Sequence, residues 1–161
     1  MTGLPLLLAA LSTSGALAAD THVGTVYTAL STADVQGLLD AMMLSNTPVP
    51  PGDAGPGWQL TLGDAAAVLF LDDCDGGACS SVQLWAGFSA SGELPPGLLN
   101  SWNRDHRFTR AYVDDDGLIH LETDLDLSGG VALDAVIELM RTFRASALAF
   151  SEHLSTPAGD P

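Results

Sequence analysis

Cys74 and Cys79 are the residues of this chain whose type and spacing most directly predict chemistry. Four residues, Asp-Gly-Gly-Ala, separate them, which excludes the Cys-x-x-Cys motif of a thiol oxidoreductase. Further soft ligands are missing from the neighbouring sequence, so a metal site is not favoured. Both cysteines lie at the mouth of an expected hairpin, where facing residues approach closely enough for a disulfide. We therefore predict a structural disulfide between Cys74 and Cys79.

Two runs of aspartates suggest cation binding, one at Asp72, Asp73 and Asp75 and one at 114–116. An EF-hand loop requires acids at its positions 1, 3 and 5, a glycine at 6 and a glutamate at 12, and neither run has that register. The second run is followed by Gly117 and is typical of a hairpin turn. The first run, beside the disulfide, is the candidate site if the chain is instead a small ligand- or cation-binding domain, or a hydrolase that uses acids.

Other patterns that would indicate catalysis are missing from the sequence. The histidines at 22, 106, 120 and 153 lie in separate regions and form no metal-binding pair. The sequence has no Gly-x-Ser-x-Gly elbow for an acyl nucleophile. It also has no lysine, which excludes Schiff-base chemistry through a lysine. We therefore predict a protein that is not an enzyme, with no catalytic residue, no metal ligands and no cofactor.

The most distinctive stretch runs from 98 to 117 and holds three of the five arginines. Arginine and tryptophan are common anchors of protein interfaces, so the stretch is a candidate interaction patch. In the alternative, which the many acids favour, it is a helix-to-strand corner. There the tryptophan packs in the core, the asparagine caps the helix and the arginines pair with acids. The residues concerned are Trp102, Asn103, Arg104, Arg107, Phe108, Arg110, Asp116 and Gly117.

Charge and composition limit the partners. Twenty acids against five arginines give a formal charge of −15 over 161 residues. We therefore expect neither nucleic acid nor an anionic membrane surface as a partner, because binding to both relies on clustered basic residues. The apolar fraction of 47% excludes a disordered acidic tail.

The first 18 residues are typical of a secretory signal peptide. An apolar stretch at 4–11 is followed by small residues and by an Ala16-Leu17-Ala18 cleavage signature. It is too short for a membrane span, so we expect no stable membrane anchor. We expect the mature chain to be periplasmic or secreted. It would have a flexible segment at 19–30, one domain at 31–154 and a disordered tail at 155–161.

Hydrophobic periodicity predicts the elements that position these residues. Ser31 and Asp34 resemble a capping box that opens a helix ending near 44. The Pro- and Gly-rich segment 46–57 is expected to be a connection. Strands are expected at 58–62, 66–71, 82–88, 108–113 and 118–127, and helices after Pro95 and at 133–154. The order α-β-β-β-α-β-β-α predicts an α+β fold with helices packed on an antiparallel sheet.

The stretch 98–117, together with the elements around it, resembles the YbjN-type family of bacterial sensory-transduction regulators. The likeness covers about 34–154 and is carried by a helix that ends in Trp-Asn, an Arg-Phe-x-Arg-Ala strand, an acidic Gly turn and a Gly-Gly-Val helix start. These pieces are Trp102-Asn103, Arg107-Phe108-Thr109-Arg110-Ala111, Asp116-Gly117, the strand 121–127, Gly129-Gly130-Val131, and a final helix with Phe143 and Phe150. The resemblance implies a fold similar to type III secretion chaperones, which are small, acidic, often dimeric and bind extended client segments. It brings no catalytic residue.

Together these observations predict an exported, non-enzymatic interaction or regulatory module, with a role in envelope stress or signalling. Its partner is expected to be a protein segment or a second copy of the chain. A basic segment is favoured by charge complementarity. The alternative is a small periplasmic domain that binds a ligand or a cation.

Overall fold

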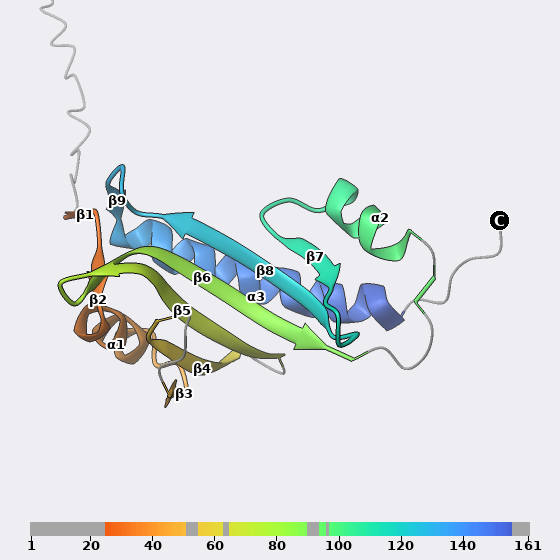
Figure 1. Ribbon diagram of the computed structural model, residues 1–161, viewed down its shortest axis with the longest axis horizontal. Coiled ribbons are helices and arrows are strands. Elements are labelled where there is room, and N and C mark those ends of the chain that lie inside the picture. The colour runs from red at the N-terminus through yellow and green to blue at the C-terminus, as the bar shows by residue number, and fades with distance from the viewer. Residues whose placement is uncertain (1–24, 51–54, 63–64, 90–93, 96, 156–161) are drawn as a thin grey trace, which may run out of the picture.

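A long C-terminal helix lies along one face of an antiparallel sheet in the computed structural model (Figure 1). The structure describes residues 25–50, 55–62, 65–89, 94–95 and 97–155. The predicted signal peptide with Ala16 and Ala18, and the tail from 156 onward, lie outside these residues. Within them the helices are α1 (Thr32–Ala41), α2 (Leu98–Asp105) and α3 (Leu133–Ser155).

The sheet has the strand order β3-β4-β5-β6-β8-β7, and every pair is antiparallel. A short β2 also pairs with β6, and β1 pairs separately with β9. The strands are β1 (Val26–Tyr27), β2 (Leu30–Ser31), β3 (Asn46–Val49), β4 (Gly57–Leu62), β5 (Ala65–Asp75), β6 (Ala78–Phe88), β7 (Arg110–Val113), β8 (Ile119–Asp126) and β9 (Val131–Ala132). The fold is therefore α+β, as predicted.

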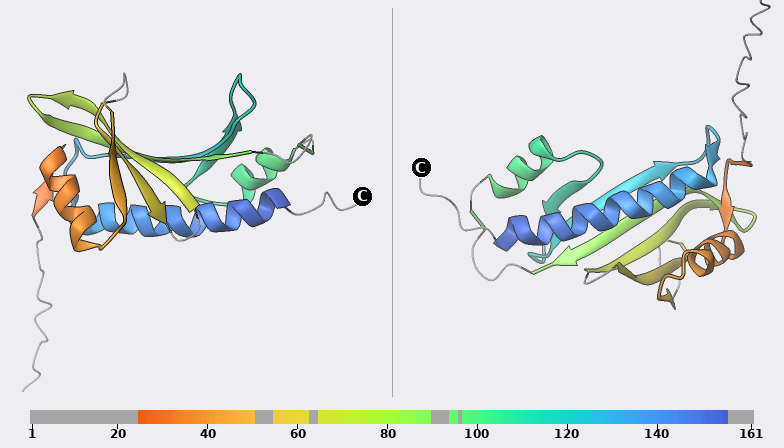
Figure 2. Two further views of the ribbon diagram at one scale, coloured as in Figure 1. Left: turned by 90° about the horizontal axis from the view of Figure 1, so that it is seen from below. Right: turned by 180° about the vertical axis from the view of Figure 1, so that it is seen from behind.

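All the helices of the described residues lie on one side of the sheet (Figure 2). The ends of the β5–β6 and β7–β8 hairpins curve away from the helices, as the left view of Figure 2 shows. The opposite face of the sheet is therefore covered by no helix within the described ranges. This one-sided arrangement decides which side chains are available for binding.

The core forms where the apolar stripe of α3 packs on the apolar face of the sheet. Along β6, Val82, Leu84 and Ala86 alternate with more exposed residues and are buried. Along α3 the buried residues recur every three or four positions, as an amphipathic helix requires. They are Val136, Met140, Phe143, Ala147 and Phe150.

The start of α1 has the capping box that the sequence predicts. The Ser31 hydroxyl accepts a hydrogen bond from the Asp34 backbone N–H at 3.2 Å, and the Asp34 carboxylate accepts one from the Ser31 N–H at 2.8 Å. These bonds satisfy two backbone donors that a helix start leaves without partners. Hydrogen bonds to Ser31 hold the pKa of Asp34 below its usual range.

Three expectations about element boundaries were wrong. Residues 46–49 are not a connection but strand β3, which pairs with β4; proline is tolerated there because β3 is an edge strand. Strand β7 begins at Arg110 and not at Phe108, because Phe108 has φ 71° and interrupts the extended backbone. Strands β5 and β6 are longer than expected, since the tight turn between them is at Gly76-Gly77.

The predicted disulfide joins Cys74 and Cys79. The two residues lie directly opposite each other at the end of the β5–β6 hairpin. Ser31 and Leu30 of β2 pair with Ala78 and Cys79, so the cross-linked hairpin also receives the chain just before α1.

Removal of this disulfide should lower the free energy of unfolding by about 2 kcal/mol, because the bond closes a small loop in the unfolded chain. Urea unfolding of the Cys74→Ser/Cys79→Ser variant, compared with the parent chain with and without reductant, measures the change. The parent should respond to reductant and the variant should not. Titration of two thiols in the denatured, unreduced parent chain would contradict the assignment.

Candidate functional site

The stretch 98–117 divides into a buried, structural part and an exposed part. Trp102 is fully buried, stacks on His106 with 3.6 Å between ring centroids, and meets Phe150 edge-on at 4.8 Å. Its indole Nε1 donates to the Thr109 hydroxyl at 3.2 Å. Trp102 is therefore a core residue that fixes α2 against α3, as the corner interpretation expects.

Asn103 ties α2 to the edge strand β7. Its side-chain oxygen accepts from the Ala111 N–H at 2.8 Å, and its side-chain nitrogen donates to the Ala111 carbonyl at 2.9 Å. The expected role of Asn103 as a helix cap is therefore replaced by this bridge. Its side-chain amide makes the two backbone hydrogen bonds with Ala111 that a residue of a further strand would make. The bridge occupies the outward backbone groups in the middle of β7, where another strand would otherwise pair.

The arginines of the motif have different surroundings. Arg104 forms an exposed ion pair with Asp105 at 2.7 Å. The guanidinium of Arg107 lies 4.8 Å from the centre of the Phe108 ring, and Phe108 is 65% exposed. Arg110 alone among the three reaches onto the sheet.

Asp116 and Gly117 form the β7–β8 turn. Gly117 has φ 83°, which glycine adopts at little cost. The Asp114 carboxylate accepts hydrogen bonds from the N–H groups of Asp116 and Leu118, at 3.0 and 2.8 Å. Both predicted turn residues therefore shape the hairpin that carries Arg110 and its neighbours.

The side of the sheet without helices gathers the remaining polar and aromatic side chains. On each strand the residues that alternate with the buried ones point to this side, and the strand register places them in neighbouring rows. We call this surface the helix-free face. It comprises Gln59, Val68, Phe70, Asp72, Ser81, Gln83, Trp85, Arg110, Tyr112, His120, Glu122, Asp124 and Asp126.

Arg110 organises the charges of the helix-free face. It contacts Glu122 at 2.5 Å and Asp124 at 3.0 Å, across β7 and β8. Gln83 of β6 donates a second hydrogen bond to Asp124 at 2.9 Å. Glu122 is only 5% exposed, and Arg110 and Tyr112 supply the hydrogen-bond partners that a buried carboxylate requires.

His120 is held on both of its ring nitrogens. The Trp85 indole N–H donates to Nδ1, and Nε2–H then donates to the Asp114 carboxylate at 2.7 Å. The Tyr112 ring stacks on the imidazole at 4.8 Å, and its hydroxyl donates to Glu122 at 3.3 Å. Both ring nitrogens of His120 are therefore engaged by side chains of the protein itself.

An acidic and apolar region adjoins this network. Val68 and Phe70 of β5 are half-buried beside Trp85 and Gln83. One row further, Asp72 lies across from Ser81, and burial with the carboxylates of Asp73 and Asp124 raises the pKa of Asp72. The face thus combines apolar surface with carboxylates that a cation would stabilise.

The predicted acidic site is not brought together as a metal centre. Asp72 belongs to the helix-free face, whereas Asp73 and Asp75 are exposed near the hairpin end. Within the described ranges, no group of three or more His, Cys, Asp or Glu side chains is placed to hold a metal ion. A helix both long and apolar enough to cross a membrane is likewise missing from the part of the chain that the structure describes.

Sequence reasoning singled out Arg110 but missed Gln83, Trp85, His120 and Glu122. The period-two alternation that predicted the strands does assign Gln83 and Trp85 to one face. The contacts of Trp85 with His120 and of Gln83 with Asp124 join residues 35 and 41 positions apart, however. Only the pairing of β6 with β8 creates these contacts, and no local sequence pattern predicts that pairing.

Replacing Asn103 with alanine should destabilise the fold by about 1–3 kcal/mol, because the N–H and C=O of Ala111 lose their partners. The matched control is Asn100→Ala, an exposed asparagine of the same helix. Urea unfolding measures both variants, and size-exclusion chromatography reports whether Asn103→Ala alone associates through β7. Equal stability of the two variants would show that the bridge is dispensable.

The acid dependence of stability should report the Asp114–His120 contact. Hydrogen bonds from His120 and from the Leu118 N–H hold the pKa of Asp114 below its usual range. The unfolded chain therefore binds the proton more readily, so this contribution is present at neutral pH and is lost as the pH falls below about 4. The stability gap between the parent and Asp114→Asn should narrow over that range, whereas Asp115→Asn serves as an exposed control. A gap that stays constant with pH would contradict this role.

Comparisons with known proteins agree with this architecture. The search of curated proteins gave no match. Among solved structures, this chain is similar to an uncharacterized protein from Methanothermobacter thermautotrophicus, with a TM-score of 0.58 and 13% identity over 78% of this chain and 97% of that one. At this identity the likeness shows the fold alone, and it is compatible with the chaperone-like arrangement that the resemblance implied. A family model described as "Putative bacterial sensory transduction regulator" matches residues 18–156, and the chain therefore belongs to the YbjN family.

Proposed function

We propose that this chain is a non-catalytic regulatory module that binds a basic and apolar segment of a partner protein on its helix-free face. The observation that carries the proposal is the network around Arg110, Glu122 and His120, which presents a rigid polar and aromatic surface on the uncovered side of the sheet. Membership of a family described as sensory transduction regulators supports a regulatory role.

The face is a better docking surface than either edge of the sheet. At one edge, the Asn103 side chain occupies the outward backbone groups of Ala111 in β7. At the other edge, β3 contains Pro48, which lacks the N–H that a further strand would need. Both edges are therefore poor templates for strand addition.

The chemistry of the face favours a basic and apolar partner. Its carboxylates outnumber its one arginine. Burial and the nearby carboxylates of Asp73 and Asp124 disfavour the charged form of Asp72 and raise its pKa. An incoming arginine or lysine would relieve this repulsion. Phe70 and Trp85, both half-buried, supply the apolar contacts that a short segment needs to stay bound.

The same geometry supports a role without catalysis. Both nitrogens of His120 and both oxygens of Glu122 are engaged by neighbouring side chains. These groups are arranged to support one another, whereas a catalytic acid or base must direct an atom toward a substrate.

Export of the chain is part of this proposal. The Cys74–Cys79 disulfide is compatible with an oxidising compartment such as the periplasm. The signal-like sequence at 1–18 supports the same location. We propose that the module acts there, in envelope signalling.

A short extended peptide that alternates arginine with valine and phenylalanine tests the proposal, with a glutamate-for-arginine peptide as its pair. The basic peptide should bind saturably and weaken as salt rises, because the attraction is partly electrostatic. Gln59→Arg, which adds a positive charge to the face, should weaken binding by about fivefold or more.

The control variant Ala145→Arg adds the same charge to the exposed, helical side of the molecule. It should leave the affinity unchanged within experimental error. Equal loss in both variants, or equal binding of the acidic peptide, would show that the helix-free face does not select the segment.

A further inference from the structure

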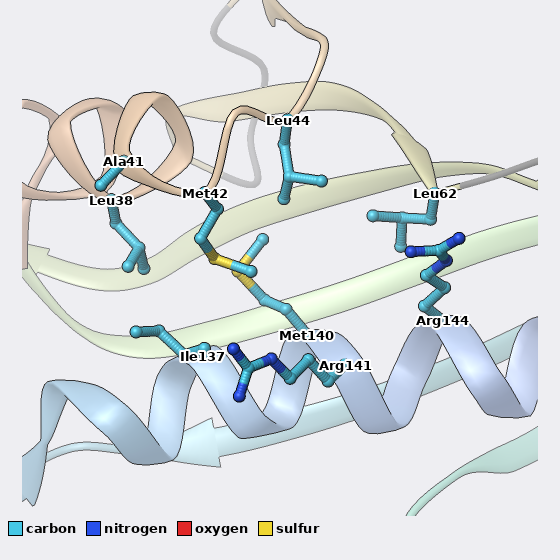
Figure 3. Close-up of a pocket in the computed structure, with 9 residues that line it drawn as sticks. All are labelled: Leu38, Ala41, Met42, Leu44, Leu62, Ile137, Met140, Arg141 and Arg144. Carbon is cyan, nitrogen blue, oxygen red and sulfur yellow. The ribbon is translucent and has the colours of Figure 1, made fainter.

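A cavity of about 480 Å³ lies between α1 and α3, on the side of the molecule opposite the helix-free face (Figure 3). Side chains from α1, from the segment after it, from the end of β4 and from α3 point into it. The volume is within the range of sites that hold small organic ligands. Its apolar lining is Leu38, Ala41, Met42, Leu44, Leu62, Ile137 and Met140.

The floor and walls of the cavity are aliphatic. Leu38, Leu62 and Met140 are buried there, and Met42 approaches from across the gap. Methionine side chains are unbranched and adaptable, so they fit flexible chains better than one fixed shape. Among the described residues, the lining contains no aromatic ring and no uncharged polar side chain, so these residues favour a ligand with an apolar body.

Two arginines complete the lining. Arg141 and Arg144 extend from successive turns of α3 beside the apolar residues. They are two of only five positive side chains in a chain with a formal charge of −15. Two guanidinium groups next to one apolar cavity favour a ligand with a negative head.

Both guanidinium groups remain available to a ligand. Arg141 approaches Glu138 only at 3.8 Å, and both side chains are about 70% exposed, so this pair contributes little. Within the described ranges, Arg144 forms no ion pair.

We propose that this cavity binds a fatty acid, with its alkyl chain among the leucine and methionine side chains and its carboxylate at Arg141 and Arg144. An alkyl chain satisfies the aliphatic walls without requiring polar partners. A single carboxylate accepts hydrogen bonds from guanidinium groups, which supply the one polar anchor in the lining. The site uses no residue of the helix-free face, so it stands independently of the proposed function.

Isothermal titration of the full chain with dodecanoate, below its micelle concentration, tests this site. We expect saturable binding of one molecule per chain. The Arg141→Gln/Arg144→Gln variant should bind about tenfold more weakly or worse, because charge-assisted hydrogen bonds are lost. Methyl dodecanoate, which keeps the chain but lacks the charge, should show a similar loss on the parent protein.

Two further variants distinguish a specific site from general attraction. Arg104→Gln/Arg107→Gln removes the same charge from exposed positions outside the cavity and should leave the affinity within about twofold of the parent. Ala41→Trp, at the exposed rim of α1, should obstruct the cavity and abolish binding, with circular dichroism to confirm folding. Lack of saturable binding, or equal affinity of the Arg141→Gln/Arg144→Gln variant and the parent, would overturn the proposal.

Discussion

Because every helix of the described residues packs on the same side of the sheet, the other side must satisfy its own polar groups without a second layer. The strands solve this with cross-strand pairs. Arg110 neutralises Glu122 and contacts Asp124, while Trp85 and Asp114 hold His120 from two sides. Glu122 is nearly buried although no helix covers it, because its neighbours on β6 and β7 enclose it. The polar side chains of the uncovered face are therefore held by one another, and a preorganised surface of this kind favours binding because little side-chain freedom is lost.

The corner between α2 and β7 places this surface. Trp102 anchors the helix in the core, and Asn103 fixes the backbone of Ala111 next to it. Arg110 directly precedes that residue, and its guanidinium contacts Glu122 and Asp124 of the neighbouring strand. The motif that carries the family resemblance thus joins the packing of the corner to the position of Arg110 on the helix-free face. The corner interpretation accounts for Trp102, whereas the interaction-patch interpretation stays a prediction.

Local patterns predicted the elements and long-range pairing created the site. The capping box at Ser31, the apolar stripe of α3 and the spacing of the cysteines each depend on residues close in sequence, and each was predictable. Strand β3 was missed because the prolines of segment 46–57 indicate a connection, and only its position at the edge of the sheet makes Pro48 acceptable. The Trp85–His120 contact could not be foreseen, since it depends on the order in which β6 and β8 meet. The cavity between α1 and α3 likewise requires the packing of two helices far apart in the chain.

Site-specific photo-crosslinking in the native host tests most directly whether the helix-free face binds a polypeptide in the cell. A photoreactive residue would replace Gln59 on that face or, as the control, Ala145 on α3, and mass spectrometry would identify what is attached. We predict a reproducible polypeptide adduct from position 59, reduced by competing basic peptide, and none from position 145. Adducts from position 145 alone, or equal adducts from both positions, would contradict the account and place the interaction on the helical side.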